Sequence, residues 1–278
     1  MDSGGPQLSR NRWAACSSKA HIMQSDFAPL LDNARPLFLQ QLTLTSRLRV
    51  LVLAPHPDDF DAIGITMRIF RDNGNPIDIG VLTSGASGVD DGLAVPLTVS
   101  EKAMLREQEQ QASCQFFGLS PEGLTFLRLA EDADGHLKMS ESNLARLRTY
   151  WEAQEPELVF LPHGHDTNVG HQRTYTMFRQ LVGGGVRSVM AFLNRDPKTI
   201  AMREEAYTVF GEEEAEWKRA LLRYHRTQQE RNLRTRQYGL DERIIRVNRQ
   251  VGKNLGLGAE YAEAFELEWY KGVSGSHA

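Results

Sequence analysis

Two short segments of the sequence concentrate side chains that can bind a metal ion or move a proton. His56, Asp58, Asp59 and Asp61 fall within six positions, and residues 163–171 add three histidines and one aspartate. Imidazole and carboxylate groups are zinc ligands, and a catalytic zinc site uses three protein ligands and keeps one position open. The pattern favours a divalent cation that is bound by two nitrogens and one carboxylate and that activates a water molecule.

Each segment also has a simpler explanation. Asp58 or Asp59 could cap the helix that follows, and a single histidine after a strand is usually a surface residue. Taken together, the two segments favour a functional site over these simpler explanations. Both follow a predicted strand, and ligands bind at the carboxyl ends of the strands in such sheets. Two consecutive aspartates can also divide the work, since one can bind metal while its neighbour takes a proton from water.

The elements that must position these residues alternate between strand-like and helix-like patterns. Short apolar runs predict buried strands, and amphipathic stretches that begin at serine or stop at glycine predict helices. The predicted strands cover residues 47–54, 77–83, 124–129, 158–161 and 186–192, and the predicted helices cover residues 62–73, 100–117, 140–153 and 171–181. Strands separated by helices of ten or more residues predict an α/β fold with a doubly wound, mostly parallel sheet.

The two ends of the chain differ from this central part. Residues 1–40 lack sustained periodicity and predict a flexible tail, with a short lead-in helix near residues 38–44. Residues 41–272 predict a single α/β domain with a C-terminal extension. In that extension, residues 212–236 predict one long charged helix, and residues 259–268 form an apolar, acidic stretch.

A basic run occupies the C-terminal part of the chain. Between Lys218 and Lys253 there are eleven lysines or arginines and three acidic residues. Such a run could form a surface for phosphate or nucleic acid. The simpler interpretation is a solvated helix face, which the neighbouring acidic residues 212–216 support, so no nucleic-acid partner is predicted.

Composition excludes several classes of protein. The 278 residues are 41% hydrophobic and 24% charged, and the net charge of -4 gives no general attraction to nucleic acid or anionic lipid. No apolar run is long enough for a membrane span, and residues 1–24 lack a secretory apolar segment, so a cytoplasmic protein is predicted. Cys16 and Cys114 are too few for a disulfide framework or a thiolate zinc site.

The chain contains an HPDD sequence after the first strand, a histidine at a later helix start, a K..L..H..Q pattern from Lys218 to Gln228 and a YAEAF sequence at residues 261–265. Together these motifs resemble the PIG-L (LmbE-like) family of zinc-dependent N-acetylglucosaminyl deacetylases. The similarity covers about residues 47–270. It implies a Rossmann-like fold with a C-terminal helical extension. It also implies zinc-dependent removal of acetyl groups from N-acetylglucosamine-type sugars attached to inositol, lipids or antibiotic scaffolds.

The resemblance also implies roles for individual residues. Carried over position by position, His56, Asp59 and His171 are the metal ligands and Asp58 is the general base. Arg106 matches an arginine that contacts substrate in some members of the family.

The sequence departs from the family pattern near His171. Where the family commonly has HPDH, this chain has Asn168 and Gly170 in place of the first histidine and the aspartate. Phe60 also replaces the glutamate of the usual HPDDE motif. Asn168 can donate a hydrogen bond but cannot transfer a proton. His165 or Asp166 would have to substitute, or the metal alone would polarise the substrate. Asn168 and Asp166 therefore join Arg106 as predicted substrate-binding residues.

Three functions remain open at this point. The first is a metal-dependent hydrolase that removes an acyl group, such as acetyl, from a small amino-sugar conjugate with Zn²⁺ or another divalent metal. The second is a different metal-assisted hydrolase. The third is a metal-binding sugar-recognition protein without turnover. Asn168 and Gly170, which replace two residues of the family pattern, support it. The substrate, the acyl group, the metal and the oligomeric state are not predicted.

Overall fold

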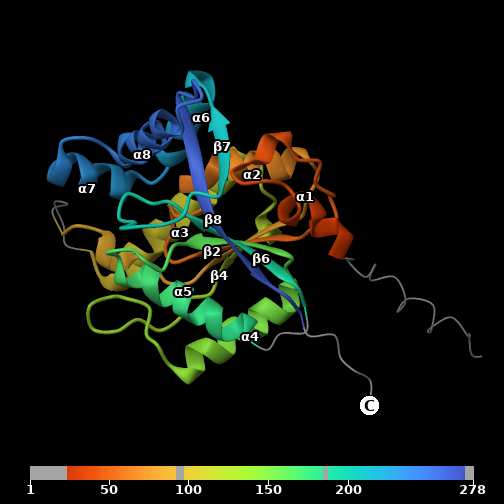
Figure 1. Cartoon of the computed structure of the whole chain (residues 1–278). Helices are drawn as coiled ribbons and strands as arrows, with labels where there is room; N and C mark the ends of the chain where they lie inside the picture. The colour runs from red at the N-terminus through yellow and green to blue at the C-terminus, as the bar shows by residue number, and fades with distance from the viewer. Residues whose placement is uncertain (1–23, 92–96, 184–186, 273–278) are drawn as a thin grey trace, which may run out of the picture.

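The computed structural model describes residues 24–91, 97–183 and 187–272. In these residues the helices pack around one mixed sheet of parallel and antiparallel strands. Within these residues the sheet has eight strands in the order β1-β7-β8-β6-β5-β2-β3-β4 (Figure 1). The strands are β1 Leu37–Phe38, β2 Val50–Ala54, β3 Ile77–Val81, β4 Leu124–Phe126, β5 Leu158–Pro162, β6 Val189–Asn194, β7 Ala206–Phe210 and β8 Tyr261–Tyr270. The helices are α1 Ala28–Leu31, α2 Gly64–Asp72, α3 Val99–Phe117, α4 Glu141–Gln154, α5 Val169–Val182, α6 Glu212–Leu222, α7 Arg226–Arg236 and α8 Leu240–Leu255.

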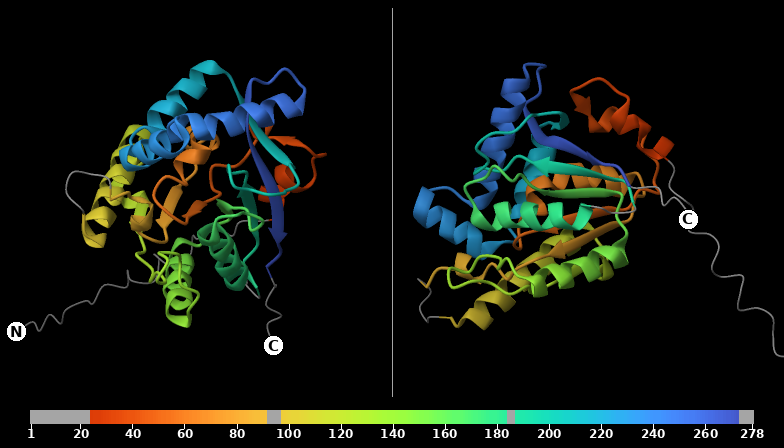
Figure 2. Two further views of the ribbon diagram at one scale, coloured as in Figure 1. Left: turned by 90° about the vertical axis from the view of Figure 1, so that its left-hand side faces the viewer. Right: turned by 60° about the horizontal axis from the view of Figure 1, so that its bottom comes forward.

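Strand β2 lies between β3 and β5, and its five residues are all buried. Successive side chains of a strand point to opposite faces of the sheet. Val50, Val52 and Ala54 accordingly pack in one core with residues of α2 and α3, while Leu51 and Leu53 pack in a second core with residues of α4 and α5. Figure 2 shows α4 and α5 on one side of the sheet and α2 with α6 to α8 on the other. The predicted doubly wound, mostly parallel sheet is confirmed.

The C-terminal extension differs from its prediction in two ways. Strand β8, predicted only as an apolar, acidic stretch, lies antiparallel between β6 and β7 inside the sheet. The predicted helix over residues 212–236 is two helices, α6 and α7, separated at Arg223–His225. His225 is fully buried and bonds to Asp61, so the chain must turn there to bring that side chain inward.

The predicted tail also needs correction. Residues 24–40 are part of the fold, because Phe27, Leu30, Leu37 and Leu39 are buried in the same core as β2. The predicted lead-in helix near residues 38–44 is only a short 3-10 turn at Leu39–Gln41. Periodicity could not show this, because the segment is buried through scattered apolar contacts. Residues 1–23 lie outside the described part.

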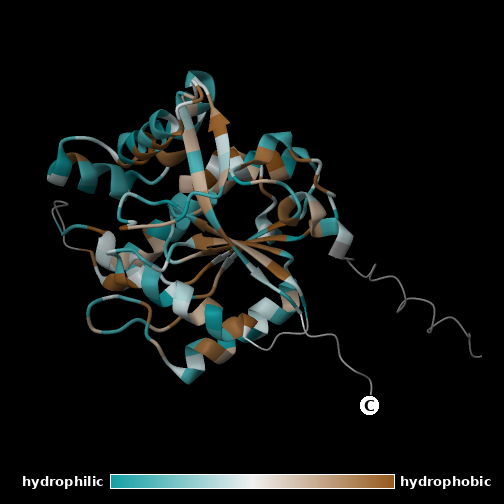
Figure 3. Cartoon of the chain, in the orientation of Figure 1, coloured by the Kyte–Doolittle hydropathy of each residue, from teal (hydrophilic) through white to brown (hydrophobic). Residues whose placement is uncertain are grey.

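Hydropathy follows this layering. Figure 3 shows hydrophobic strands at the centre and a mostly hydrophilic α7 at the periphery. Cys114 is buried in α3. Among the described residues, no helix combines the length and the apolar character needed to cross a membrane. The cytoplasmic location stays a prediction.

Candidate functional site

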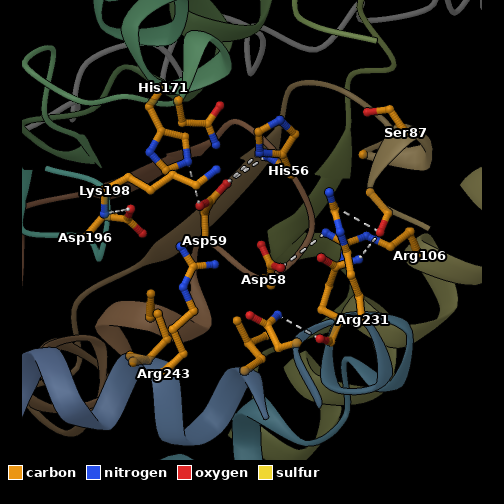
Figure 4. A pocket seen from close by; sticks show the side chains of 18 of the residues that line it. His56, Asp58, Asp59, Ser87, Arg106, His171, Asp196, Lys198, Arg231 and Arg243 are labelled. Atoms are coloured by element: carbon orange, nitrogen blue, oxygen red, sulfur yellow. Dashed lines mark hydrogen bonds and ion pairs between the residues drawn. The ribbon is translucent and has the colours of Figure 1, made fainter. Parts of the chain in front are cut away.

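The carboxyl ends of β2, β5 and β6 meet at one edge of the sheet and border a cavity of about 330 Å³. His56, Asp58 and Asp59 reach it from the loop after β2, and His171 reaches it from the first turn of α5 (Figure 4). The two segments singled out in the sequence therefore do converge. The convergence depends on β2 and β5 being adjacent and parallel.

His56, Asp59 and His171 form a compact donor set. Their ligand atoms lie within 4.8 Å of one another. Oδ2 of Asp59 is 3.3 Å from Nδ1 of His56, and Oδ1 of Asp59 is 3.4 Å from Nε2 of His171. The backbone N–H of His56 donates to Oδ2 of Asp59 at 2.9 Å and helps to fix this carboxylate. Two imidazoles and one carboxylate are a donor set that suits zinc.

The electrostatics of this set also suit a cation. Burial opposes ionisation of Asp59, but the adjacent His171 and His56 outweigh it, so the pKa of the Asp59 carboxyl lies well below its usual range. Burial likewise opposes the charged form of His171, but Asp59 and Asp166 raise its pKa well above the ordinary value. The site thus favours positive charge between its carboxylates, and the residues present fit a divalent metal ion.

Asp166 lies behind His171 and does not line the cavity. Its side chain is fully buried, and its Oδ2 accepts from Nδ1 of His171 at 3.1 Å. Its Oδ1 accepts from the backbone N–H of Asn168 at 2.6 Å. Both oxygens are therefore engaged with the protein. This geometry fits a group that orients His171 better than the predicted substrate contact, because such a bond leaves Nε2 of His171 free for metal.

Asp196, which follows β6, is a third carboxylate near His171. It lines the cavity and forms a second possible ligand group with Asp166 and His171. Burial, together with the carboxylates of Asp166 and Asp59, raises the pKa of Asp196 against the opposing charge of His171. Asp196 could not be predicted from the sequence, because it lies in no histidine-rich motif.

Asp58 is held in an unusual backbone conformation. Its φ of 105° lies in the region that favours glycine, where other residues are strained and where strain often accompanies function. Its N–H donates to Oε1 of Gln110 on α3 at 2.8 Å. Its Oδ2 lies 3.3 Å from Nη2 of Arg106. The adjacent Asp59 can thus engage the two histidines while Asp58 faces α3.

Arg106 is 2% exposed and lines the cavity from α3. Besides Asp58, its Nη2 contacts the carbonyl of Pro57. Its Nε and Nη1 are buried and have no hydrogen-bond partner within the described residues. A buried guanidinium with unused donors can bind an oxygen-rich ligand. The predicted role in substrate contact stays a prediction that this geometry suits.

Asn168 and Gly170 have clear local roles. Asn168 is the N-cap of α5, and its Oδ1 accepts from the N–H of Gly170 at 3.0 Å. Asn168 lines the cavity, and its remaining amide N–H groups can donate to a ligand. A Cβ on residue 170 would lie 2.9 Å from Nε2 of His56. Gly170 is therefore required by the close approach of the His56 ring.

Other histidines take different places. His165 is exposed and does not line the cavity, so neither of the two substitutes proposed for the missing family histidine faces it. His136 lines the cavity instead, from the loop after β4. His225 is fully buried, as expected of a packing histidine, and its Nε2 bonds to Oδ2 of Asp61 at 2.8 Å. No sequence pattern indicates a role for His136 beyond its residue type.

The family model described as PIG-L: GlcNAc-PI de-N-acetylase matches residues 51–182. This segment contains the HPDD motif, Arg106 and His171. The resemblance to the PIG-L family is confirmed over these residues. No curated protein matches the chain.

Three solved structures illustrate the shared fold. The chain is similar to N,N'-diacetylchitobiose deacetylase from Pyrococcus horikoshii, with 19% identity, 79% of this chain and 83% of that chain covered and a TM-score of 0.65. GalB, the 4-carboxy-2-hydroxymuconate hydratase from Pseudomonas putida KT2440, has 19% identity, coverage of 79% and 96% and a TM-score of 0.63. A zinc-inhibited form of teicoplanin deacetylase has 15% identity, coverage of 80% and 98% and a TM-score of 0.59.

These identities support the fold and not a particular reaction. Two of the three structures are named as deacetylases and one as a hydratase. The fold therefore carries more than one kind of chemistry, and function must be argued from the site.

Proposed function

We propose that this protein is a metal-dependent hydrolase that removes an acyl group, acetyl in the simplest case, from an N-acylated amino sugar or sugar conjugate. The observation that carries the proposal is the His56, Asp59 and His171 donor set with Asp58 beside it in one cavity. The PIG-L match over residues 51–182 supports the same reaction, and two of the proteins that share the fold are named as deacetylases.

The metal would be held by His56, Asp59 and His171. A zinc ion bound there supplies Lewis-acid polarisation and lowers the pKa of water. Asp166 acts through His171, whose ring it orients by the bond to Nδ1. Asp58 is the general base, because it is adjacent to a ligand residue without belonging to the donor set.

Proton balance can be achieved without the missing family histidine. Hydrolysis of an amide consumes one water and yields a carboxylate and a protonated amine. Asp58 can take a proton from water and return it to the leaving nitrogen. His136 and Lys198 also line the cavity and are further donors for that nitrogen. Asn168 cannot transfer a proton, but it can donate a hydrogen bond to the substrate.

An assay for acetate release tests the proposal. We expect zinc-loaded protein to release acetate from at least one member of a panel of N-acetylglucosamine, N,N'-diacetylchitobiose and their phosphorylated or carboxylated derivatives. The Asp58→Asn variant, prepared in the same way, serves as the control for contaminating activity. Release at the same rate by parent and variant would contradict the proposal.

The alternative without turnover has its own support. Asn168 and Gly170 remove two polar groups that the family pattern contains at these positions. A metal-binding sugar-recognition protein would bind members of the same panel in a zinc-dependent manner and release no acetate. Equilibrium binding measured beside the acetate assay separates the two functions.

A further inference from the structure

The basic run of the C-terminal part divides into two groups in the structure. One group pairs with carboxylates: Arg219 with Glu212, Arg223 with Asp241, Arg234 with Asp90 and Arg246 with Glu242. Arg223, Arg234 and Arg246 are exposed, as expected of a solvated helix face, whereas Arg219 is largely buried. The second group lines the candidate site.

Arg231 and Arg236 on α7 and Arg243 on α8 line the cavity that contains the metal-binding residues. Lys198, from the segment after β6, lines it too. Within the described residues, the side chains of these four cations form no ion pair with a carboxylate. Figure 4 shows Lys198 and Arg243 extending toward Asp59 from different elements. One wall of the cavity is therefore cationic.

Four aspartates line the cavity within the described residues, and none of them forms an ion pair with this wall. Asp58 pairs with Arg106, and Asp59 lies between the two imidazoles of the donor set. Asp134 and Asp196 are the other two, and Oδ1 of Asp196 accepts from the backbone N–H of Lys198. Lys198 and Arg243 are only partly exposed, so both have lost part of their contact with water. Like charges gathered in a concave site attract an anion, because the low-dielectric walls focus their field.

A second, wider hollow of about 740 Å³ adjoins the cavity and shares three of its cations, Lys198, Arg236 and Arg243. Its lining adds Arg246, which stacks on Tyr238 at 4.1 Å from the ring centroid, and among the described residues that line it none is acidic. The shared cations thus lie at the junction of the two hollows. A ligand could reach the donor set at one end while its charged part lies at this junction.

We propose that Lys198, Arg231, Arg236 and Arg243 form a subsite for a phosphate or carboxylate group carried by the substrate. This proposal rests on the proposed function and names its substrate class, an anionic N-acyl amino-sugar conjugate. Guanidinium groups suit it, because their planar array of donors matches the oxygens of phosphate and carboxylate. Proximity to the donor set favours a small anionic conjugate over a nucleic acid.

Equilibrium binding tests the subsite without requiring turnover. Zinc-loaded protein is titrated with N-acetylglucosamine, with N-acetylglucosamine 6-phosphate and with N-acetylmuramic acid, which carries a carboxylate. We expect at least one anionic sugar to bind about 10-fold or more tightly than the neutral sugar, since hydrogen bonds to charged groups contribute at this level. The tighter of the two anionic sugars identifies the preferred group. Equal binding of all three sugars would overturn the proposal.

Paired charge variants locate the effect. The double variant Arg236→Gln/Arg243→Gln should abolish the preference for the anionic sugar and leave binding of the neutral sugar within about 2-fold. The matched control, Arg226→Gln/Lys253→Gln, removes the same charge from α7 and α8 at positions outside both hollows. An equal loss in the control would overturn the proposal, because it would show a general charge effect.

The two proposals fail in different ways. Absence of acetate release with a retained preference for anionic sugars would contradict the hydrolase and support the subsite. A single-stranded oligonucleotide in the same titration tests the other source of phosphate. If it binds through Arg236 and Arg243 while the sugars show no preference, the subsite for a small conjugate is overturned in favour of nucleic acid.

Discussion

The two walls of the cavity are built in different ways. On the wall formed after β2 and β5, each acidic or imidazole group of the donor set is fixed by a hydrogen bond or close ion pair, as in the chain from Asp166 through His171 to Asp59. On the wall formed by α7 and α8, Arg236 and Arg243 have no carboxylate partner among the described residues. The first wall suits a reaction that needs fixed geometry. The second suits recognition by charge, which tolerates variation in the ligand.

Metal removal should have the largest effect on turnover, because the proposed reaction depends on a metal ion held by the first wall. We expect a chelator to reduce turnover to background and added zinc to restore it. His56→Ala and His171→Ala should each lose bound metal by elemental analysis. His165→Ala, at an exposed position outside the cavity, is the control. Retention of metal by both ligand variants would contradict the assignment.

The neighbouring aspartates should separate chemistry from metal binding. Asp58→Asn keeps the shape of the side chain but removes the base, so turnover should fall by roughly 10²- to 10⁴-fold. Its zinc content should remain that of the parent. Asp59→Asn should instead lose zinc together with turnover. Full turnover in Asp58→Asn with full metal content in Asp59→Asn would show that the roles are assigned wrongly.

The orienting role of Asp166 predicts a smaller effect. Asp166→Asn weakens an acceptor for Nδ1 of His171 and should lower zinc affinity or turnover by roughly 10- to 100-fold. Competition with a chromogenic chelator measures the affinity. Asp134→Asn, which changes a cavity residue outside the donor set, should leave zinc affinity unchanged. A substrate contact at Asp166 would change the Michaelis constant and spare the metal.

The smallest effect concerns the loop that carries His136. Arg173 pairs with Asp132, and this bond, with backbone N–H groups of the loop, lowers the pKa of Asp132 to about 2. Because the folded-state pKa is below the ordinary value of 3.8, the pair stabilises the fold above pH 3.8 and the contribution is lost as pH falls toward 2.

Denaturant unfolding at pH 6 and pH 3 tests this expectation. The difference in free energy of unfolding between the parent and Asp132→Asn should shrink at the lower pH. Arg173→Gln should reduce the same pH dependence, since it removes the partner. An unchanged difference would contradict the role of the pair.

The first wall could be predicted from the sequence because local signals specify it. The strand over residues 47–54, the HPDD sequence and His171 at a helix start each follow from neighbouring residues, and a parallel sheet brings them together. The second wall could not be predicted. Arg236 and Arg243 lie in a run that pattern analysis assigns to a solvated face, and only the packing of α7 and α8 separates cavity residues from surface residues.

Two differences between the predicted and the observed fold also arise because local sequence patterns do not encode contacts between distant residues. The buried bond between His225 and Asp61 divides the predicted long helix, and no local pattern encodes a partner 164 positions away. Strand β8 contains glutamates at positions 263, 266 and 268 and therefore lacks the apolar run that marked the central strands. Glu263 is nevertheless buried there, where it binds Lys218 and the N–H groups of Ile65 and Thr66.

The position of β8 also bears on the order in which the protein can form during synthesis. Strands β2 to β6 pair with one another without it, whereas β7 and β1 join the sheet only through β8. The ribosome therefore releases the residues of the donor set long before Tyr261–Tyr270 can close the sheet edge at β6. Until then, that edge presents unpaired backbone groups to other chains. We expect nascent chains that lack β8 to depend on chaperones, even though their donor set has already been synthesised.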